Sequence, residues 1–213
     1  MLLVFTYPND GYPTVVMNHG PPGFSASDGM NSQGLAFGLA SVRNIGYISP
    51  TKPALPSNSA YRLVLEHSAS VDEAVAMLSS IPVSFINLSS NEVISHILLA
   101  DRTGDSAVVE YLPEGMVVSR TDTPYQVMTN SHWAGPSDQP QCDRYRTAVA
   151  GLKKATGKMD DEGLMKLLAS IQGSTQWSII YDLEDLSLVL ALPDDGFSTR
   201  HEFSLAEFIS RMK

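Results

Sequence analysis

Short apolar runs separated by Gly and Pro mark the beginning of the chain. The runs occupy residues 2–7 (LLVFTY), 14–19 (TVVMNH) and 34–42 (GLAFGLASV). Apolar runs of this length, bounded by turn-forming residues, are typical of β-strands. Residues 49–58 (SPTKPALPSN) carry three prolines, and this composition predicts a loop.

Helical spacing of apolar residues appears after this loop. Residues 59–68 and 70–81 have this spacing, and the second segment opens with Ser70 three residues before Glu73, which is a capping-box pattern. Three more helices are predicted at residues 142–154, 160–171 and 204–213. The segment 160–171 has acidic residues at its start and 204–213 has basic residues at its end, as the helix dipole favours.

The middle of the chain is rich in β-branched residues. Residues 93–101, 106–112 and 115–120 are short runs separated by RTGD and PEG, which predicts an antiparallel meander. Residues 125–130 are predicted to form a further strand, and residues 175–192 a hairpin around the polar turn LEDL.

The order of elements is strands, helices, strands, helices, strands. This order favours an α+β fold in which antiparallel sheets pack against helices, rather than a parallel βαβ fold. A chain of 213 residues fits one domain, and we expect residues 1–213 to form a single one. The GxGxxG and GxxxxGK[ST] fingerprints do not occur, so dinucleotide-binding and P-loop functions lose their main support.

The charge balance argues against polyanionic partners. Fourteen Lys and Arg face 23 Asp and Glu, for a net charge of −9, which phosphate backbones and anionic lipid surfaces repel. We therefore expect no nucleic-acid and no membrane partner. The single cysteine, Cys142, excludes an internal disulfide and a Cys-rich zinc site, and it suits a cytoplasmic location.

The adjacent Ser131 and His132 suggest a hydrolytic dyad at first sight. If the strand 125–130 continues through them, their side chains point to opposite faces and cannot act together. No GxSxG elbow is present either. We expect Ser131 to make a local backbone hydrogen bond and His132 to lie on a surface loop.

Other reactive side chains are dispersed. Cys142 stands at the start of a predicted helix, where a thiol pKa can be lowered. The five histidines lack the HxxxH or HxH spacing of local metal ligands, so neither a metal nor a cofactor is expected. Arg144 and Arg146 are two residues apart on a helix and face different directions, so one can point inward while the other stays in water. Several acids are expected to be turn formers: Asp101, Asp105, Glu184 and Asp185.

Five stretches together resemble a known family. They are residues 27–39 (SDGMNSQGLAFGL), 96–120, 125–133 (YQVMTNSHW), 143–148 (DRYRTA) and 175–192. In this order they resemble the N-terminal-nucleophile (Ntn) hydrolases of the linear amide C–N hydrolase group. That group includes choloylglycine (bile salt) hydrolases, penicillin V acylase and acyl-coenzyme A:6-aminopenicillanic acid acyltransferase.

The resemblance implies a four-layer αββα sandwich with antiparallel sheets. It also implies hydrolysis of a small acyl-amide substrate, or acyl transfer, through a thioester on an N-terminal cysteine. The free α-amino group of such a cysteine, with a pKa near ~8, can serve as the base for its own side chain.

The resemblance also assigns roles to three residues. Asn130 matches the asparagine that supplies an oxyanion-hole donor, and Arg144 matches an arginine that lines the surroundings of the nucleophile. Ser41, or Ala40 in a shifted alignment, stands where bile salt hydrolases carry a second active-site asparagine, so Ser41 is the candidate substrate-binding residue. Asn31 is better interpreted as a turn residue.

The start of the chain departs from the family pattern. The family opens with its nucleophilic cysteine, whereas this chain opens Met1-Leu2-Leu3, and the internal Cys142 has no α-amino group. We therefore expect an N-terminally incomplete fold that lacks the nucleophile hairpin and is inactive alone. The alternative is a catalytically inactive family member that serves as a binding or assembly module. Uncovered strand edges near residues 2–7 would favour a homo-oligomer.

Overall fold

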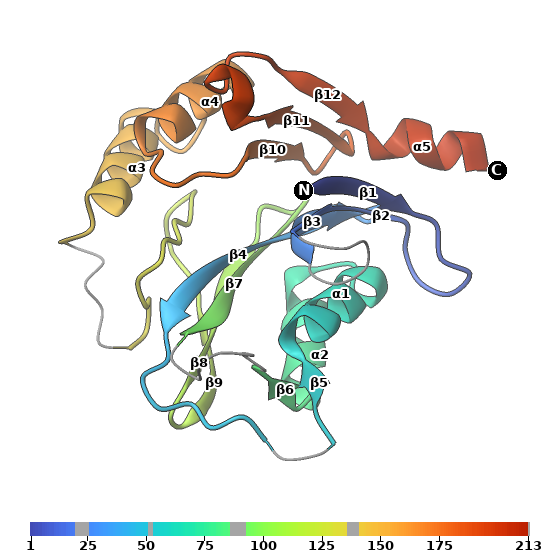
Figure 1. Ribbon diagram of the computed structural model, residues 1–213, viewed down its shortest axis with the longest axis vertical. Helices are drawn as coiled ribbons and strands as arrows, with labels where there is room; N and C mark the ends of the chain where they lie inside the picture. Colours follow the sequence, from blue (N-terminus) through green and yellow to red (C-terminus); the bar gives the residue numbers. More distant parts are fainter. Residues whose placement is uncertain (20–25, 51–52, 86–92, 136–140, 213) are drawn as a thin grey trace.

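A seven-stranded antiparallel sheet forms the centre of the molecule. The computed structural model describes residues 1–19, 26–50, 53–85, 93–135 and 141–212. The strands lie in the order β1-β2-β3-β4-β7-β8-β9, and every neighbouring pair is antiparallel (Figure 1). Their bounds are β1 (Leu2–Thr6), β2 (Thr14–Asn18), β3 (Ala26–Asn31), β4 (Leu35–Arg43), β7 (Val93–Asp101), β8 (Ser106–Leu112) and β9 (Gly115–Ser119).

Helices cover one face of this sheet and a second sheet covers part of the other. The helices are α1 (Ser57–His67) and α2 (Val71–Ser80). The second sheet has the antiparallel order β10 (Ser178–Asp182), β11 (Ser187–Ala191), β12 (His201–Ser204), with α3 (Asp143–Lys154) and α4 (Asp161–Ser170) beside it and α5 (Leu205–Met212) at the end of the chain (Figure 1). The result is the four-layer αββα sandwich of the Ntn-hydrolase type.

The alternation of side chains in β2 explains why two layers pack on the sheet. All five residues of β2 are buried. Val16 joins the helix-side core, while Val15 and Met17 join the sheet-side core. Successive strand residues point to opposite faces, so a strand that is apolar at consecutive positions needs cover on both sides.

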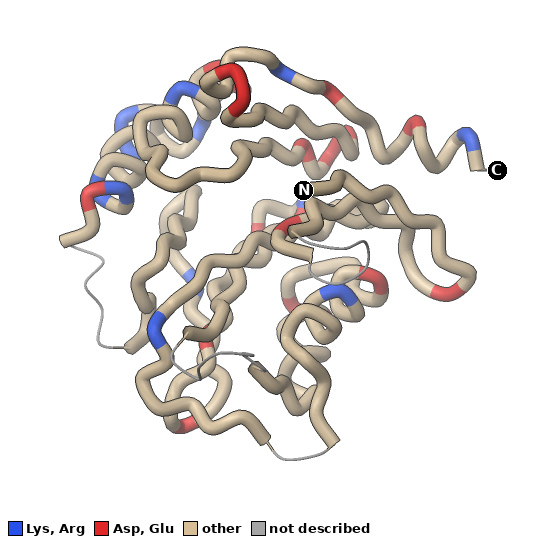
Figure 2. The backbone as a smooth tube through the Cα atoms, in the orientation of Figure 1, with Lys and Arg blue, Asp and Glu red and all other residues tan. Residues whose placement is uncertain are grey.

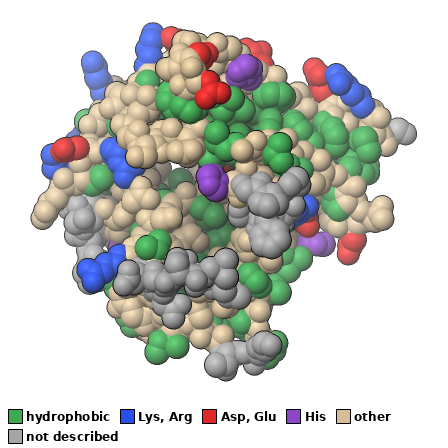
Figure 3. All heavy atoms as spheres, in the orientation of Figure 1, with side chains coloured by type: hydrophobic (Ala, Val, Ile, Leu, Met, Phe, Trp, Pro, Cys, Tyr) green, Lys and Arg blue, Asp and Glu red, His purple; other side chains and the backbone are tan. Residues whose placement is uncertain are grey.

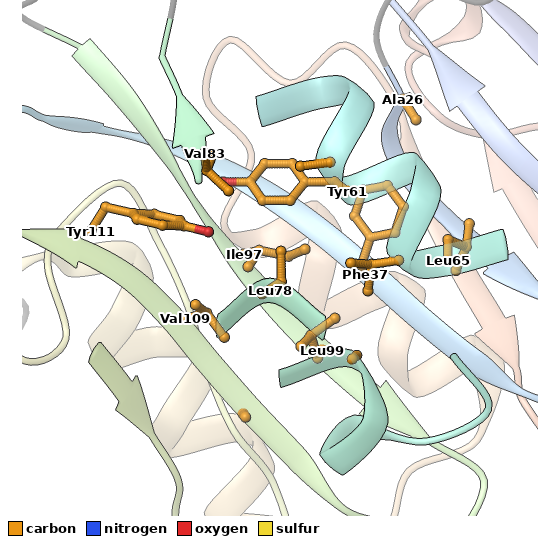
Figure 4. Close-up of a cluster of buried hydrophobic side chains, with 14 of the residues drawn as sticks. Ala26, Phe37, Tyr61, Leu65, Leu78, Val83, Ile97, Leu99, Val109 and Tyr111 are labelled. Atoms are coloured by element: carbon orange, nitrogen blue, oxygen red, sulfur yellow. The ribbon is translucent and has the colours of Figure 1, made fainter. Parts of the chain in front are cut away.

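The helix-side core is the larger of the two hydrophobic clusters. Tyr61 of α1 is fully buried in it and stacks at an angle against Phe37 of β4 (Figure 4). Leu78 of α2 lies beside Ile97 of β7 in the same cluster. The sheet-side core joins β2–β4 to β11 and α5 through Val15, Met17, Met30, Ala36, Leu188, Leu190 and Leu205.

Local signals placed the helix ends correctly. Oγ of Ser70 accepts a hydrogen bond from the Glu73 amide at 3.3 Å, and the Glu73 carboxylate accepts one from the Ala69 amide at 2.7 Å. The predicted capping box at the start of α2 is therefore confirmed. Asp160 caps α4 in the same way, accepting from the Gly163 amide at 2.9 Å.

Most predicted strands are confirmed, and the differences have physical reasons. The strands 93–101 and 106–112 have the predicted bounds. The predicted strand 125–130 is wrong, because this segment belongs to no sheet and its polar groups bond to side chains, as with Thr129 O and His96. The strands β3 and β12 were missed, since ASDGMN and HEFS are rich in polar residues that are uncommon in strands.

Two smaller differences concern the segment around residues 49–58, predicted as a loop. Residues 51–52 lie outside the described part of the chain. Beyond them, the two-residue strand β5 (Leu55–Pro56) pairs in parallel with β6 (Val83–Ser84), and α1 begins at Ser57.

A short 3-10 helix, η2, spans Pro193–Asp195, between β11 and β12.

Charged residues lie mainly on helices and turns rather than in the large sheet (Figure 2). Glu110 of β8 is the exception that matters for the site, because it is fully buried. None of the described helices has the length and apolar character needed to cross a bilayer.

Candidate active site

Three exposed polar residues from distant parts of the chain meet at the end of β4. Nδ2 of Asn130 donates to the carbonyl oxygen of Ser41 at 2.9 Å. A terminal guanidinium nitrogen of Arg144, in the first turn of α3, donates to Oδ1 of Asn130 at 2.8 Å. The structure therefore brings together the three residues that the resemblance singled out.

The two partners fix the orientation of the Asn130 amide. A guanidinium is a pure donor and a carbonyl is a pure acceptor, so Oδ1 must face Arg144 and Nδ2 must face Ser41. An amide nitrogen carries two N–H groups, and the contact with Ser41 uses one of them. The second N–H is left for an acceptor in the neighbouring space.

Open space lies over β4, at Gly38, three residues before Ser41. Gly38 of β4 is on the same face of the sheet as Ala36, which packs against the second sheet. A Cβ added to Gly38 would meet nothing within 4 Å. Figure 3 shows a hollow in this face of the molecule, between the second sheet and β4.

A buried carboxylate organises the segment that carries Asn130. Oε1 of Glu110 accepts from the Trp133 amide at 2.9 Å, and Oε2 accepts from the Ala134 amide at 2.6 Å. Burial alone would raise the pKa of Glu110. The hydrogen bonds from His96 and from these two amides outweigh burial and lower the pKa to about 2.

Two histidines complete this arrangement. His96 of β7 places Nδ1 at 3.2 Å from Glu110 Oε1 and Nε2 at 2.7 Å from the carbonyl oxygen of Thr129. His132 places Nδ1 at 3.0 Å from the same Oε1 and Nε2 at 2.8 Å from the carbonyl oxygen of Arg43. We call residues 129–134 the Asn130 loop; these contacts fasten it to β4, β7 and β8.

The Ser131–His132 dyad is excluded by these contacts, as the sequence analysis expected on other grounds. Both ring nitrogens of His132 are occupied, so neither can act as the base for Ser131. The expectation that His132 lies on a surface loop is wrong. It is 5% exposed, because the charge of Glu110 draws its ring inward.

Cys142 is the N-cap residue of α3 and lies two residues before Arg144. Burial would raise the pKa of its thiol, but the nearby amide of Tyr145, the side chain of Thr129 and the charge of Arg144 lower it. The predicted direction of the shift is confirmed. An internal cysteine still has no α-amino group to serve as its base.

The half-buried carboxyl of Asp28 joins the two sheets. Asp28 of β3 accepts hydrogen bonds from Nε1 of Trp177 at 2.6 Å and from the hydroxyl of Tyr181, on β10, at 2.5 Å. Burial raises the pKa of Asp28 to about 6, although both hydrogen bonds act to lower it.

The remaining candidates have structural roles. Oδ1 of Asn31 accepts from the Gln33 and Leu35 amides, and its Nδ2 donates to two carbonyls at the end of α1, which confirms Asn31 as a turn residue. Asp101 accepts from the amide and hydroxyl of Thr103 in the predicted turn. Arg146 is also exposed but pairs with Asp143, whereas Arg144 contacts Asn130. In the described part of the chain, no three His, Cys, Asp or Glu side chains are grouped to hold a metal ion.

Sequence reasoning missed Glu110 and His96 as parts of the site. The available signal was a charged residue within the apolar run SAVVEYL, whose neighbours are all buried. A carboxylate in such a position needs a buried partner, and His96 lies on the adjacent strand.

Comparison with known proteins identifies the family. Residues 1–181 match the family described as "Acyl-coenzyme A:6-aminopenicillanic acid acyl-transferase". The chain belongs to this family. A curated relative of the acyl-transferase family member is "Penicillin V acylase" of Pectobacterium atrosepticum, which is 35% identical over 115 residues, covering 50% of this chain and 30% of the relative.

Solved structures share the fold of this acyl-transferase family member. A variant of conjugated bile acid hydrolase from Clostridium perfringens superposes with a TM-score of 0.71 at 18% identity, covering 92% of this chain and 78% of that one. Penicillin V acylase from Agrobacterium tumefaciens gives a TM-score of 0.66 at 22% identity, covering 90% and 68%. At this level of identity the likeness shows the αββα fold. The chain spans about a third of the length of the curated relative.

Proposed function

We propose that this chain carries part of the active site of an enzyme that cleaves linear amides. The enzyme passes the acyl group either to water or to an amine. The observation that carries the proposal is the Asn130 amide, held with one N–H on Ser41 O and its oxygen on Arg144. A fixed N–H donor beside open space suits a developing oxyanion, because it costs no reorganisation during the reaction.

Arg144 has two parts in this proposal. It fixes Asn130 from the oxygen side, and its positive charge lies where it would favour a thiolate over a thiol. Ser41 contributes its carbonyl oxygen to Asn130 and its exposed side chain to the substrate. All three residues are exposed, so they are accessible to an incoming group.

The nucleophile in this proposal is neither Cys142 nor Ser131. Cys142 lacks an α-amino group, and His132 has no nitrogen left to activate Ser131. We propose that an N-terminal cysteine from outside residues 1–213 supplies the attacking sulfur and occupies the space over Gly38. The family membership supports acyl transfer as the reaction, since the family is described as an acyl-transferase.

The proposed substrate is a small acyl-amide. Two of the similar proteins are a penicillin V acylase and a conjugated bile acid hydrolase, and the resemblance noted in the sequence implies cleavage of a linear amide. Because Ser41 replaces the second asparagine expected from bile salt hydrolases, we favour a penicillin V-like acyl-amide over a conjugated bile acid.

The decisive experiment assays penicillin V cleavage by residues 1–213 and by the product of the full reading frame. We expect no turnover from residues 1–213, and turnover from a longer product that begins with cysteine. Asn130→Ala in that product should lower kcat by roughly 10²–10³, whereas the surface variant Asn58→Ala should not. Turnover by residues 1–213 that survives Cys142→Ala would overturn the proposal. A stop codon immediately upstream of Met1 would support an inactive binding module instead.

We also propose that the chain self-associates through β1, at the edge of the seven-stranded sheet. The strand LLVFT carries neither charge nor proline, Met1 and Leu2 are 52% and 44% exposed, and an uncharged edge strand pairs readily with another strand. Leu2→Lys should dissociate the oligomer in analytical ultracentrifugation. Val93→Lys, which alters an equally exposed residue on β7, should not. A wild-type chain that stays monomeric at about 100 µM would contradict self-association, because assembly depends on protomer concentration.

Two further proposals concern the chain as a whole. We propose that residues 1–213 fold as one domain, because both cores are built on the same sheet. A single unfolding transition in calorimetry supports this, and two separate transitions contradict it.

We also propose a cytoplasmic location, supported by the single cysteine. Cell fractionation tests the location.

A further inference from the structure

The rings of His96 and His132 make four contacts with acceptor oxygens around Glu110. Two neutral rings carry too few N–H groups to make all four contacts hydrogen bonds. Each ring of His96 and His132 has one nitrogen against Oε1 of Glu110 and the other against a backbone carbonyl. The four nitrogen–oxygen distances run from 2.7 to 3.2 Å. All four contacts are therefore within hydrogen-bond range, and the three oxygens that make them, Glu110 Oε1 and the two carbonyl oxygens, are all acceptors.

Proton counting decides what these contacts require. A neutral imidazole carries one N–H, so two neutral rings supply two protons for four nitrogen–oxygen contacts. Glu110 cannot make up the difference, because Oε1 and Oε2 already accept the amides of Trp133 and Ala134. These donors also keep the carboxylate ionised. A neutral ring would leave a nitrogen lone pair facing an oxygen lone pair in a buried place.

We propose that His96 and His132 are positioning residues that hold the Asn130 loop as imidazolium cations. The oxyanion donor is then correctly placed only while both rings carry two protons. The catalytic part of this inference rests on the function proposed above; the protonation of the rings and the order of the loop do not.

The place of the two contacts in the chain explains the coupling to Asn130. His96 binds the carbonyl of Thr129, the residue immediately before Asn130. His132 binds the carbonyl of Arg43, two residues after Ser41, whose own carbonyl receives the Asn130 amide. Loss of either ring proton therefore loosens one of the two contacts that flank the Asn130–Ser41 hydrogen bond.

Other charged or titratable groups of the described residues stand on the same elements. They are Tyr111 on β8, Asp101 on β7, Arg43 at the end of β4, and Cys142, Asp143, Arg144, Tyr145 and Arg146 at the start of α3. Asp101 accepts from the amides of Val71 and Thr103, so Glu110 is the carboxylate that contacts both rings, whose centroids are 6.4 Å apart. The carbonyl dipoles of Thr129 and Arg43 stabilise the remaining positive charge from the opposite side of each ring.

The test is the nitrogen resonances of the histidine rings in residues 1–213 at pH 7.5. We expect both nitrogens of His96 and of His132 at the shifts of a doubly protonated imidazolium, with assignments from His96→Gln and His132→Gln. The exposed His201 is the internal reference for the ring resonances. One bare nitrogen on either buried ring at pH 7.5 would overturn the proposal.

A second measurement follows the loop itself. Protection of the Trp133 and Ala134 amides against hydrogen exchange, corrected for the intrinsic rate, should fall at least tenfold as pH rises and the rings lose their protons. In His132→Gln, whose amide reaches towards Arg43 O without a titrating proton, this fall should shrink. Protection that stays constant from pH 6 to 9 in the wild-type chain contradicts the coupling. A zinc or EDTA addition that shifts the ring signals would assign the site to a metal instead and also overturn it.

The catalytic consequence has its own readout. In a longer product that turns over penicillin V, His132→Gln should change the pH profile of kcat on its alkaline side, while His201→Gln leaves the profile unchanged. If no product turns over substrate, the proposed function fails and the ring resonances still decide the protonation. If turnover occurs with neutral rings, the proposed function stands and this inference fails.

Discussion

Arg144 and Asn130 form a hydrogen bond of 2.8 Å between the first turn of α3 and a loop that belongs to no sheet. The bond sets the Asn130 amide with its nitrogen towards Ser41 and the open space beside β4. A surface arginine thus determines the direction of a potential oxyanion donor.

Asn130→Asp keeps one contact of this side chain and removes the other. The carboxylate keeps an acceptor for Arg144 but places an oxygen against the carbonyl of Ser41. We expect kcat to fall by roughly 10²–10³, as for loss of an oxyanion donor, in any longer product that turns over penicillin V. A KM effect with unchanged kcat would instead assign Asn130 to uniform binding.

Arg144→Ala and Arg146→Ala form a matched pair on one helix. Both side chains are exposed, and only Arg144 contacts Asn130. We expect the free energy of unfolding to change by less than about 1 kcal/mol in both variants, since exposed pairs contribute little. Steady-state turnover should fall in Arg144→Ala alone. Equal turnover in the two variants would remove Arg144 from the site.

Asp28 predicts a loss of stability as pH rises. Burial raises its pKa in the fold to about 6 from an ordinary value of 3.8, so the folded state binds a proton more tightly than the unfolded chain does. Its contribution is complete below pH 4 and is lost as pH rises to about 6. Asp28→Asn should flatten urea-unfolding stability across this window by roughly 1–2 kcal/mol. An unchanged pH dependence would refute this assignment.

Glu110 acts in the opposite direction. Its pKa is lowered to about 2 from 4.5, so its contribution to stability is present above pH 4.5 and is lost as pH falls towards 2. Glu110→Gln should destabilise the fold at pH 7 by roughly 2–4 kcal/mol, because it leaves buried donors without their charged acceptor. The difference from wild type should narrow in acid, as thermal or urea unfolding at pH 3 can show.

Asn31 tests the link between the β3–β4 hairpin and α1. Its side chain is fully buried and makes four hydrogen bonds, two as donor to carbonyls at the end of α1. Asn31→Asp keeps the acceptor side and puts an oxygen against those carbonyls, so we expect a loss of roughly 2–4 kcal/mol. Asn44→Asp is the comparison variant: its side chain is half-buried and its Nδ2 donates to the carbonyl of Tyr47, so the same change should cost less there than at the fully buried Asn31. Equal losses in chemical denaturation would contradict the assignment.

Patterns within short segments predicted the fold well. Strands such as β7 and β8 are apolar at consecutive positions and end at clear turns, so their bounds follow from the sequence. The capping box of α2 is local in the same sense. β3 and β12 are short and polar, and they become strands because neighbouring strands pair with them, a condition that no local pattern carries.

The site was predicted through a resemblance rather than through local chemistry. Asn130, Arg144 and Ser41 lie far apart in the sequence, and composition gives no reason to join them. The segment 125–130 was assigned to a strand because its apolar residues suit one, while its order comes from side chains of other elements. His132 was expected in solvent because its partner, Glu110, lies 22 residues away.

The conformation of the Asn130 loop depends on one carboxylate of β8, that of Glu110, which bonds to His132, Trp133 and Ala134. A relative in which an apolar residue replaced Glu110 would leave two buried rings and two backbone amides without an acceptor. Such a replacement can persist only if both histidines change as well. Positions 96, 110 and 132 are therefore expected to vary together among relatives, as one inherited unit rather than as three independent residues.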